Sequence, residues 1–241
     1  GGKIERGKMI SHFSQIPDAK LVMFDVSPKN LLKIAGEKFT KLYRWQLNRF
    51  RYGMGVFKMD FALSQSIPWK SKEIKGAGTV HLGGTLEEIA HSEKLIWEGK
   101  YSQNPFVLVA QQSVFDKTRS PDGYHTAWAY CHVPSDSEVD MSTIIEDQIE
   151  KYAPGFKETI IGKHTFNTKE MENYNPNYIG GDINSGVQDW SQIFTRPALR
   201  ISPYRTSFKK IYICSASTPP GGGVHGMGGY YAAKRAIKDL F

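Results

Sequence analysis

The apolar positions near the two ends of the chain form two short continuous runs, and a helical pattern follows each of them. The first run spans residues 21–26, and Ser27-Pro28 after it is typical of a helix start, with Ser as N-cap and Pro at the first helical position. This helix is predicted to end at Gly36. The second run spans residues 211–214. A helix from residue 224 onward is predicted by an apolar stripe at Ala232, Ala233, Ala236, Ile237 and Leu240. A strand followed by a helix at both ends favours a parallel α/β layer.

The middle of the chain carries a different pattern, in which apolar and polar positions alternate. Phe57, Met59, Phe61 and Leu63 point to one side of residues 55–64, which predicts a strand with one buried face. Further strands are predicted at residues 79–82, 106–111, 124–133 and 158–166, and helices at residues 39–50, 85–99 and 141–152. Thr85 and Glu88 predict a capping box at the start of the second of these helices. The predicted fold class is therefore α/β, with an α+β middle built on an antiparallel sheet.

The strand predicted at residues 124–133 has one aromatic face. Its alternate positions are Tyr124, Thr126, Trp128, Tyr130 and His132. An aromatic face favours packing in the core, which is the interpretation adopted here. A channel for a long hydrophobic substrate would use the same face.

Residues 215–223 form a loop of small residues, prolines and glycines between the last predicted strand and helix. Backbone N–H groups are unpaired at a helix start, so a ligand can lie against glycines there. Gly221, Gly223 and Gly226 fit the dinucleotide spacing, but no second strand with an acidic residue can follow before the chain ends. A first-position Rossmann unit and a P-loop are both excluded. The glycines at positions 226, 228 and 229 disfavour a helix, by about 0.5–1 kcal/mol each, and favour close approach of a large planar ligand.

The sequence Ser-Ala-Ser-Thr-Pro-Pro-Gly-Gly-Gly-Val-His-Gly-Met at residues 215–227 resembles the C-terminal flavin motif of the phytoene desaturase and carotenoid isomerase group of FAD-dependent oxidoreductases. Residues 77–89, 125–134 and 174–183 are also similar to phytoene-dehydrogenase-related oxidoreductases, so the resemblance covers nearly the whole chain. The family's N-terminal Gly-x-Gly-x-x-Gly, which holds the ADP half of FAD, has no counterpart here. The resemblance therefore implies the C-terminal half of a protein about twice as long.

The resemblance also implies which residues contact the flavin. The backbone amides of residues 224–227 would face the pyrimidine edge of the ring, where a helix N-terminus stabilises negative charge. Asp182 would hydrogen-bond the flavin or its ribityl chain, and Ala216 replaces the ribityl-binding carboxylate of amine oxidases. His225 is the weak candidate for an acid or base, and no catalytic residue is assigned. The cofactor-binding set is Asp182, Ser215, Ala216, Ser217, Thr218, Gly221, Gly222, Gly223, Val224, His225, Gly226 and Met227.

The resemblance divides the chain into parts of a Rossmann-like FAD-binding domain at residues 1–40 and 203–241 and a substrate-binding domain at residues 41–202. It implies a desaturase, dehydrogenase or isomerase that acts on a hydrophobic substrate such as a polyene. We expect the chain alone to bind FAD weakly and to be inactive, because the ADP-binding half would be a separate partner. We also expect a distorted or mobile loop at residues 219–226, and an oligomer or partner that covers the open sheet.

The uneven distribution of charge allows a second interpretation of the function. Residues 1–75 carry 15 Lys or Arg against 6 Asp or Glu, which would also suit a non-enzymatic binding module for an acidic partner or an anionic membrane. Residues 43–52 interleave cations with aromatics, which fits peripheral membrane contact as well as an ordinary amphipathic surface. Nucleic acid is not the expected partner.

Other features exclude further classes of function. The seven histidines lack helical ligand spacing, so no metal is expected. The two cysteines fit buried thiols in a reduced compartment. No apolar run is long enough to cross a membrane and no signal peptide is recognisable, so the expected location is cytoplasmic, with or without peripheral membrane contact.

Overall fold

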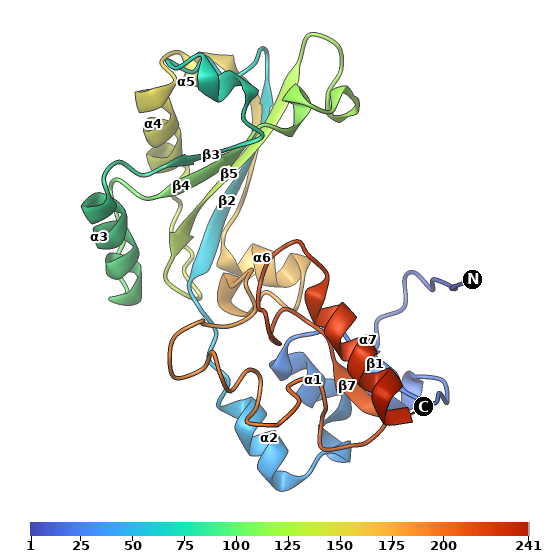
Figure 1. Cartoon of the computed structure of the whole chain (residues 1–241). Helices are drawn as coiled ribbons and strands as arrows, with labels where there is room; N and C mark the ends of the chain where they lie inside the picture. The colour runs from blue at the N-terminus through green and yellow to red at the C-terminus, as the bar shows by residue number, and fades with distance from the viewer. Residues whose placement is uncertain (241) are drawn as a thin grey trace. The chain divides into compact units, whose positions relative to one another are not determined.

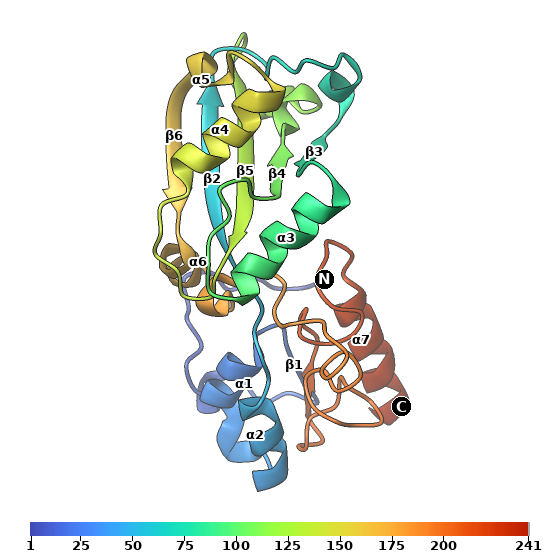
Figure 2. The same ribbon diagram turned by 90° about the vertical axis from the view of Figure 1, so that its left-hand side faces the viewer.

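The computed structural model describes residues 1–240, so Phe241, the last residue of the predicted 203–241 segment, lies outside the described residues. The chain forms two compact units (Figures 1 and 2). The terminal unit consists of Gly1–Gly53, Pro176–Ile179 and Ile183–Phe241. The sheet unit consists of Met54–Asn175 and Gly180–Asp182.

In the terminal unit, the first and last strands pair with each other in parallel. Strand β1 (Val22–Phe24) lies beside β7 (Ile211–Ile213), with Val22 opposite Ile211 and Phe24 opposite Ile213. Figure 1 shows the pair with α1 and α7 of the same unit beside it. The prediction that the runs at residues 21–26 and 211–214 share one sheet is confirmed. The mixed α/β fold class, with a parallel pair and an antiparallel sheet, is confirmed as well.

Helices complete the terminal unit. Helix α1 (Pro28–Ala35) has Ser27 as its N-cap, whose side chain accepts a hydrogen bond from the Asn30 amide. Helix α2 (Lys41–Asn48) follows a short 3₁₀ turn. Tyr43 and Leu47 on α2 pack against Leu31 of α1 and Ile213 of β7. Because of this packing, residues 41–53 belong to the terminal unit, whereas the sequence analysis placed the boundary at residue 40.

The sheet unit contains one five-stranded antiparallel sheet of order β3-β4-β5-β2-β6. Its strands are β2 (Gly55–Leu63), β3 (Thr79–Leu82), β4 (Val107–Ala110), β5 (His125–Val133) and β6 (Ile160–Phe166). Its helices are α3 (Leu86–Trp97), α4 (Ser142–Tyr152), α5 (Phe156–Thr159) and α6 (Thr168–Tyr174). The predicted capping box at the start of α3 is present, with Thr85 and Glu88 bonded to each other's backbone amides.

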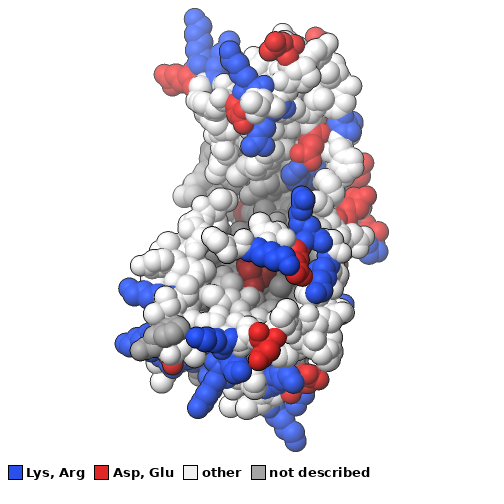
Figure 3. Space-filling view, turned by 90° about the vertical axis from the view of Figure 1, so that its right-hand side faces the viewer, with Lys and Arg blue, Asp and Glu red and all other residues white. Residues whose placement is uncertain are grey.

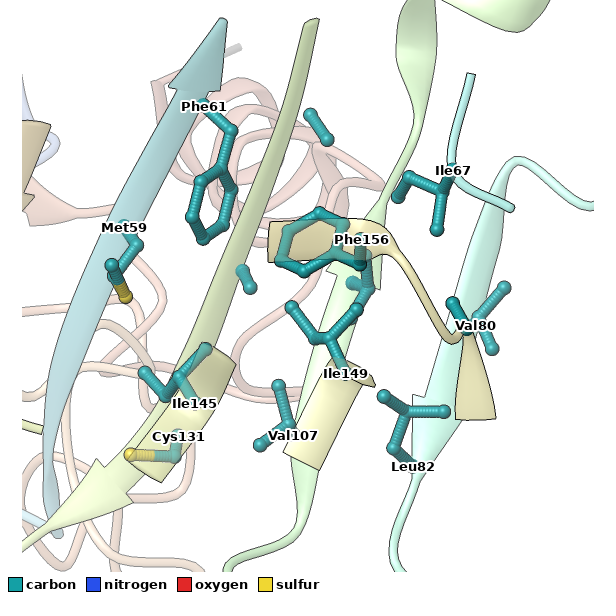
Figure 4. Packing of buried hydrophobic residues seen from close by; sticks show 14 of the residues in the cluster. Met59, Phe61, Ile67, Val80, Leu82, Val107, Cys131, Ile145, Ile149 and Phe156 are labelled. Atoms are coloured by element: carbon teal, nitrogen blue, oxygen red, sulfur yellow. The ribbon is translucent and has the colours of Figure 1, made fainter. Parts of the chain in front are cut away.

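Helix α4 lies across one face of this sheet (Figure 2). Its Ile145 and Ile149 lie in the same buried cluster as Met59 and Phe61 of β2 (Figure 4). From β5 the cluster takes Ala127, Ala129, Cys131 and Val133. The expectation that the aromatic face of β5 forms the core is therefore wrong, because the small residues of this strand face α4.

Helix α7 (Met227–Leu240) differs from its prediction at both its start and its buried face. It begins three residues later than predicted, because Gly226 has φ +64° and its carbonyl accepts the first bond, from the Tyr230 amide. Ala232 and Ala236 are buried, whereas Ile237 is exposed. Within residues 1–240, no helix combines the length and the apolar character that crossing a membrane requires.

Candidate functional site

A groove of about 610 Å³ lies in the terminal unit, where β1 and β7 end and α7 begins. Parallel strands bind ligands beyond their carboxyl ends, and a helix N-terminus offers free amides at the same place. The lining residues are Asp25, Cys214, Ser215, Ala216, Gly221, Gly223, Val224, His225, Gly226, Met227, Gly228 and Gly229. The structure thus brings eight of the twelve predicted cofactor-binding residues together around one groove.

Glycines shape the wall of this groove in two ways. A Cβ added at Gly228 would lie 2.6 Å from the Cys214 carbonyl oxygen, so glycine lets the first turn of α7 pack against the end of β7. A Cβ at Gly226 or Gly229 would meet no protein atom within 4 Å. The space beside these two lining residues is therefore open to a ligand.

Two predicted residues, Ser217 and Thr218, are fully buried and hold the loop together from inside. The Ser217 hydroxyl lies 2.6 Å from that of Ser185, and the Thr218 hydroxyl donates to the Ser215 carbonyl at 2.7 Å. Both hydroxyls are thus committed to protein partners. Their position fits support of the loop rather than direct contact with a ligand.

Arg196, which the sequence analysis did not single out, is 2% exposed and links two segments of the loop region. Its guanidinium donates to the carbonyls of Ser185, Gly186 and Val187 and, at 2.9 Å, to that of Ala216. The Ala216 carbonyl is part of the predicted flavin motif. Nothing in the local sequence marks this arginine, because its partners are backbone atoms up to 20 residues away.

His225 lies at the exposed lip of the groove and caps α7. The Met227 amide donates to its Nδ1 at 3.0 Å, which leaves Nε2 to carry the proton of the neutral ring. The candidate acid or base thus has a structural task, and its exposed Nε2 is the atom available for chemistry.

Asp25 is a groove residue that the sequence analysis missed. It follows β1 directly, and a carboxylate at the end of a buried strand is the signal that could have revealed it. Burial and, secondarily, the nearby Asp25 carboxylate raise the pKa of the Cys214 thiol to about 11. Cys214 is therefore a neutral thiol in the groove at neutral pH.

Asp182 belongs to the sheet unit, where its side chain is buried. It is absent from the groove lining, and its flavin contact stays a prediction. Among residues 1–240, no group of three or more His, Cys, Asp and Glu side chains is arranged to hold a metal ion.

The sheet face opposite α4 is the second candidate surface. The rings of Trp128 and Tyr130 stack with centroids 6.1 Å apart and planes 9° apart. Lys58 on β2 forms an ion pair with Asp60, and its Nζ lies 5.9 Å from the centre of the Trp128 ring and 5.7 Å from that of Phe166. Trp128, Tyr130 and Phe166 are partly exposed, so their rings are available to a hydrophobic ligand.

Charge is mixed over the molecular surface seen in Figure 3, where acidic side chains lie among the basic ones.

Comparisons with known proteins show that parts of the chain are similar to proteins described as oxidoreductases. The pyridine nucleotide-disulfide oxidoreductase domain-containing protein 2 of Rattus norvegicus is 30% identical over 154 residues, which are 59% of this chain and 26% of that protein. The Mus musculus protein of the same name matches equally well. The chain is a distant relative of these proteins. It spans about a quarter of their length.

Two further comparisons concern a shorter sequence match and the fold. A limonene dehydrogenase subunit of Castellaniella defragrans is 33% identical over 82 residues, or 34% of this chain and 15% of that protein. The crystal structure of an oxidoreductase from Methanosarcina mazei superposes with a TM-score of 0.52 at 12% identity, over 92% of this chain and 43% of the other. At that identity the likeness concerns the fold alone, and the chain matches part of the fold of that protein. No family model matches the sequence.

Proposed function

We propose that this chain is part of an FAD-dependent oxidoreductase and that its groove holds the ring end of the flavin. The observation that carries the proposal is the groove itself, with a glycine-rich loop and the amide end of α7 at the carboxyl ends of parallel β1 and β7. FAD supplies the redox chemistry when bound. The chain would supply position, amide hydrogen bonds and a dry environment.

The residues present fit a planar ring. Gly226 and Gly229 leave the groove side of the wall open, and the backbone amides at residues 224–227 precede or begin α7. Negative charge on a ligand there is stabilised by about 0.3–1 kcal/mol through the helix dipole. His225 fixes the Met227 amide and so helps to set the direction of this helix start.

We further propose a hydrophobic substrate with carbon–carbon double bonds, bound by the aromatic face of the sheet unit. Support comes from the partly exposed Trp128, Tyr130 and Phe166 and from the resemblance of the C-terminal motif to phytoene desaturases. The name of the Castellaniella relative points to limonene, a small apolar alkene, as the compound that this relative oxidises. We propose that the reaction is a desaturation or an isomerisation. We also propose that a partner segment binds the ADP half of FAD.

The groove can be tested with a substitution that leaves the fold intact. Gly229→Leu adds a side chain where a Cβ meets open space, so the helix is retained while the groove is narrowed. Saturation-transfer NMR with FMN detects weak binding and serves as the readout. We expect the variant to melt at the same or a slightly higher temperature and to weaken FMN binding at least about tenfold. Unchanged FMN binding by a folded Gly229→Leu variant would place the flavin elsewhere.

A further inference from the structure

Helix α2 and residues 190–201 together expose a cluster of large apolar side chains in the terminal unit. Residues 43–52 were expected to fit peripheral membrane contact, but Tyr43, Leu47 and Phe50 from that stretch are buried. The exposed apolar residues come from both segments instead. They are Leu42, Trp45, Trp190, Ile193, Phe194, Leu199 and Ile201, with exposed fractions from 42% to 105%.

Hydrogen bonds and packing join the two segments into one surface. Arg51, just after α2, is paired with Asp189 at 2.7 Å, and its backbone bonds twice to the Gln192 side chain. Ala198 packs in the same cluster as Tyr43 and Leu47. A shallow groove of about 360 Å³ is lined by residues of both segments, among them Trp45, Thr195 and Leu199.

Four exposed cations lie in or next to the same two segments: Lys41, Arg44, Arg49 and Arg200. Within the described part of the chain, none of the four forms an ion pair. Arg49 lies over the Trp45 ring at 4.9 Å and Arg200 over the Tyr43 ring at 5.4 Å. We call the seven apolar residues and these four cations the aromatic–basic patch. The patch carries a net positive charge, because it contains four cations and no acidic residue. The Arg51–Asp189 ion pair beside it adds no net charge.

We propose that the aromatic–basic patch docks the protein on a membrane surface that contains anionic lipids. Tryptophan and other aromatic rings favour the interface between headgroups and acyl chains, and Lys and Arg beside them are attracted to anionic lipid. Leu199 and Ile201 distinguish this partner from single-stranded nucleic acid, because aliphatic side chains have no π-face for base stacking but insert readily between lipids. An apolar substrate dissolved in the membrane would then be at hand.

The proposal is independent of the flavin, because lipid binding is measured without any cofactor. The test is co-sedimentation of the full chain with phosphatidylcholine vesicles that contain phosphatidylserine and with pure phosphatidylcholine vesicles, at low and high salt. We expect binding to the anionic vesicles, reduced by salt. Arg44→Gln with Arg49→Gln should weaken it roughly 25-fold, since each cation near an anionic surface contributes about a fivefold factor. Trp190→Ala with Phe194→Ala should weaken binding to a similar degree.

Matched controls come from the sheet unit. Lys72→Gln with Lys75→Gln removes two exposed cations, and Leu86→Ala with Phe115→Ala removes two exposed apolar side chains. Both controls should bind vesicles as the unaltered chain does, and all variants should melt at the same temperature. Equal sedimentation with neutral and anionic vesicles would overturn the proposal, as would controls that weaken binding as much as the patch variants. A dimer that is lost on Trp190→Ala, with no vesicle binding, would assign the patch to a second copy instead.

Discussion

Arg196 is the residue on which the conformation of the glycine-rich loop most depends. A buried guanidinium requires hydrogen bonds to offset its desolvation, and here four carbonyls supply them. Three of these carbonyls belong to residues 185–187 and the fourth to Ala216. One side chain thus fixes the distance between the two segments that form the support and the wall of the groove.

Replacing Arg196 tests this role. Arg196→Met removes a donor from four carbonyls, of which that of Val187 keeps a bond from the Gln192 side chain, so we expect the free energy of unfolding to fall by about 3–5 kcal/mol. Urea denaturation measures the change. The control is Arg119→Met, which removes an exposed arginine paired with Asp116 and should change stability by less than about 1 kcal/mol. If Arg196→Met lowers the free energy of unfolding no more than Arg119→Met does, the loop does not depend on the hydrogen bonds of Arg196.

The buried thiol of Cys131 predicts a pH dependence. Burial, with a smaller effect from Glu93, raises the pKa of Cys131 to about 12, whereas an unfolded cysteine titrates near pH 8.5. A group whose folded pKa is raised contributes stability that is complete below the unfolded pKa and is lost as the pH rises toward the folded one. The free energy of unfolding should therefore fall by about 1–2 kcal/mol more between pH 8 and pH 10 in the unaltered chain than in Cys131→Ala. Urea denaturation at the two pH values measures this fall. An equal fall in the free energy of unfolding in both proteins would contradict the assigned burial.

Single residues also show where sequence reasoning reached its limit. The sequence predicted that Gly221, Gly223 and residues 224–227 lie together at a helix start, because glycine and helix-start signals are local. Their contact with a flavin stays a prediction. Arg196 and Ser185 were not predicted, because their contacts join segments that are distant in sequence. The aromatic face of β5 was assigned to the core because its residues are larger, but Ala127, Ala129 and Cys131 make room for the side chains of α4.

At the scale of elements, two neighbouring glycines at the start of α7 have different surroundings. Gly228 packs closely against the end of β7, whereas Gly229 faces open space. Gly228→Ala would place a methyl 2.6 Å from the backbone oxygen of Cys214, whereas Gly229→Ala meets nothing. We expect the first change to lower the free energy of unfolding by about 1–3 kcal/mol. The second should raise it by up to about 1 kcal/mol, because alanine favours the helix. Thermal melts measure these opposite changes in stability. A change in melting temperature of the same sign and size in both variants would be inconsistent with the packing described.

Most elements could be predicted, because their signals are periodic or local. The alternation at residues 55–64, the Ser27 cap and the Thr85–Glu88 box each led to the observed element. The start of α7 was misplaced because Val224 and His225 look compatible with a helix, while the positive φ of Gly226 delays it. Which unit α2 joins could not be predicted, because α2 is amphipathic and its sequence alone does not say against which unit it packs.

At the scale of the whole molecule, the two units offer different chemistry. The terminal unit carries the groove at the parallel strand ends and the aromatic–basic patch, and the sheet unit carries the partly exposed aromatic face. The relatives that match the chain are about four times longer than the matched segment. The flavin account therefore assigns to this chain the ring end of FAD, and assigns the ADP end to a dinucleotide-binding segment outside the described groove.

The most direct test of that division is to titrate the chain with FAD and with FMN under the same conditions. If the groove contacts the flavin ring and no ADP-binding site is present, both ligands should bind weakly, with dissociation constants that agree within about threefold. FAD that binds at micromolar concentration or tighter, and at least about tenfold more tightly than FMN, would show that this chain holds the ADP half and would contradict the account.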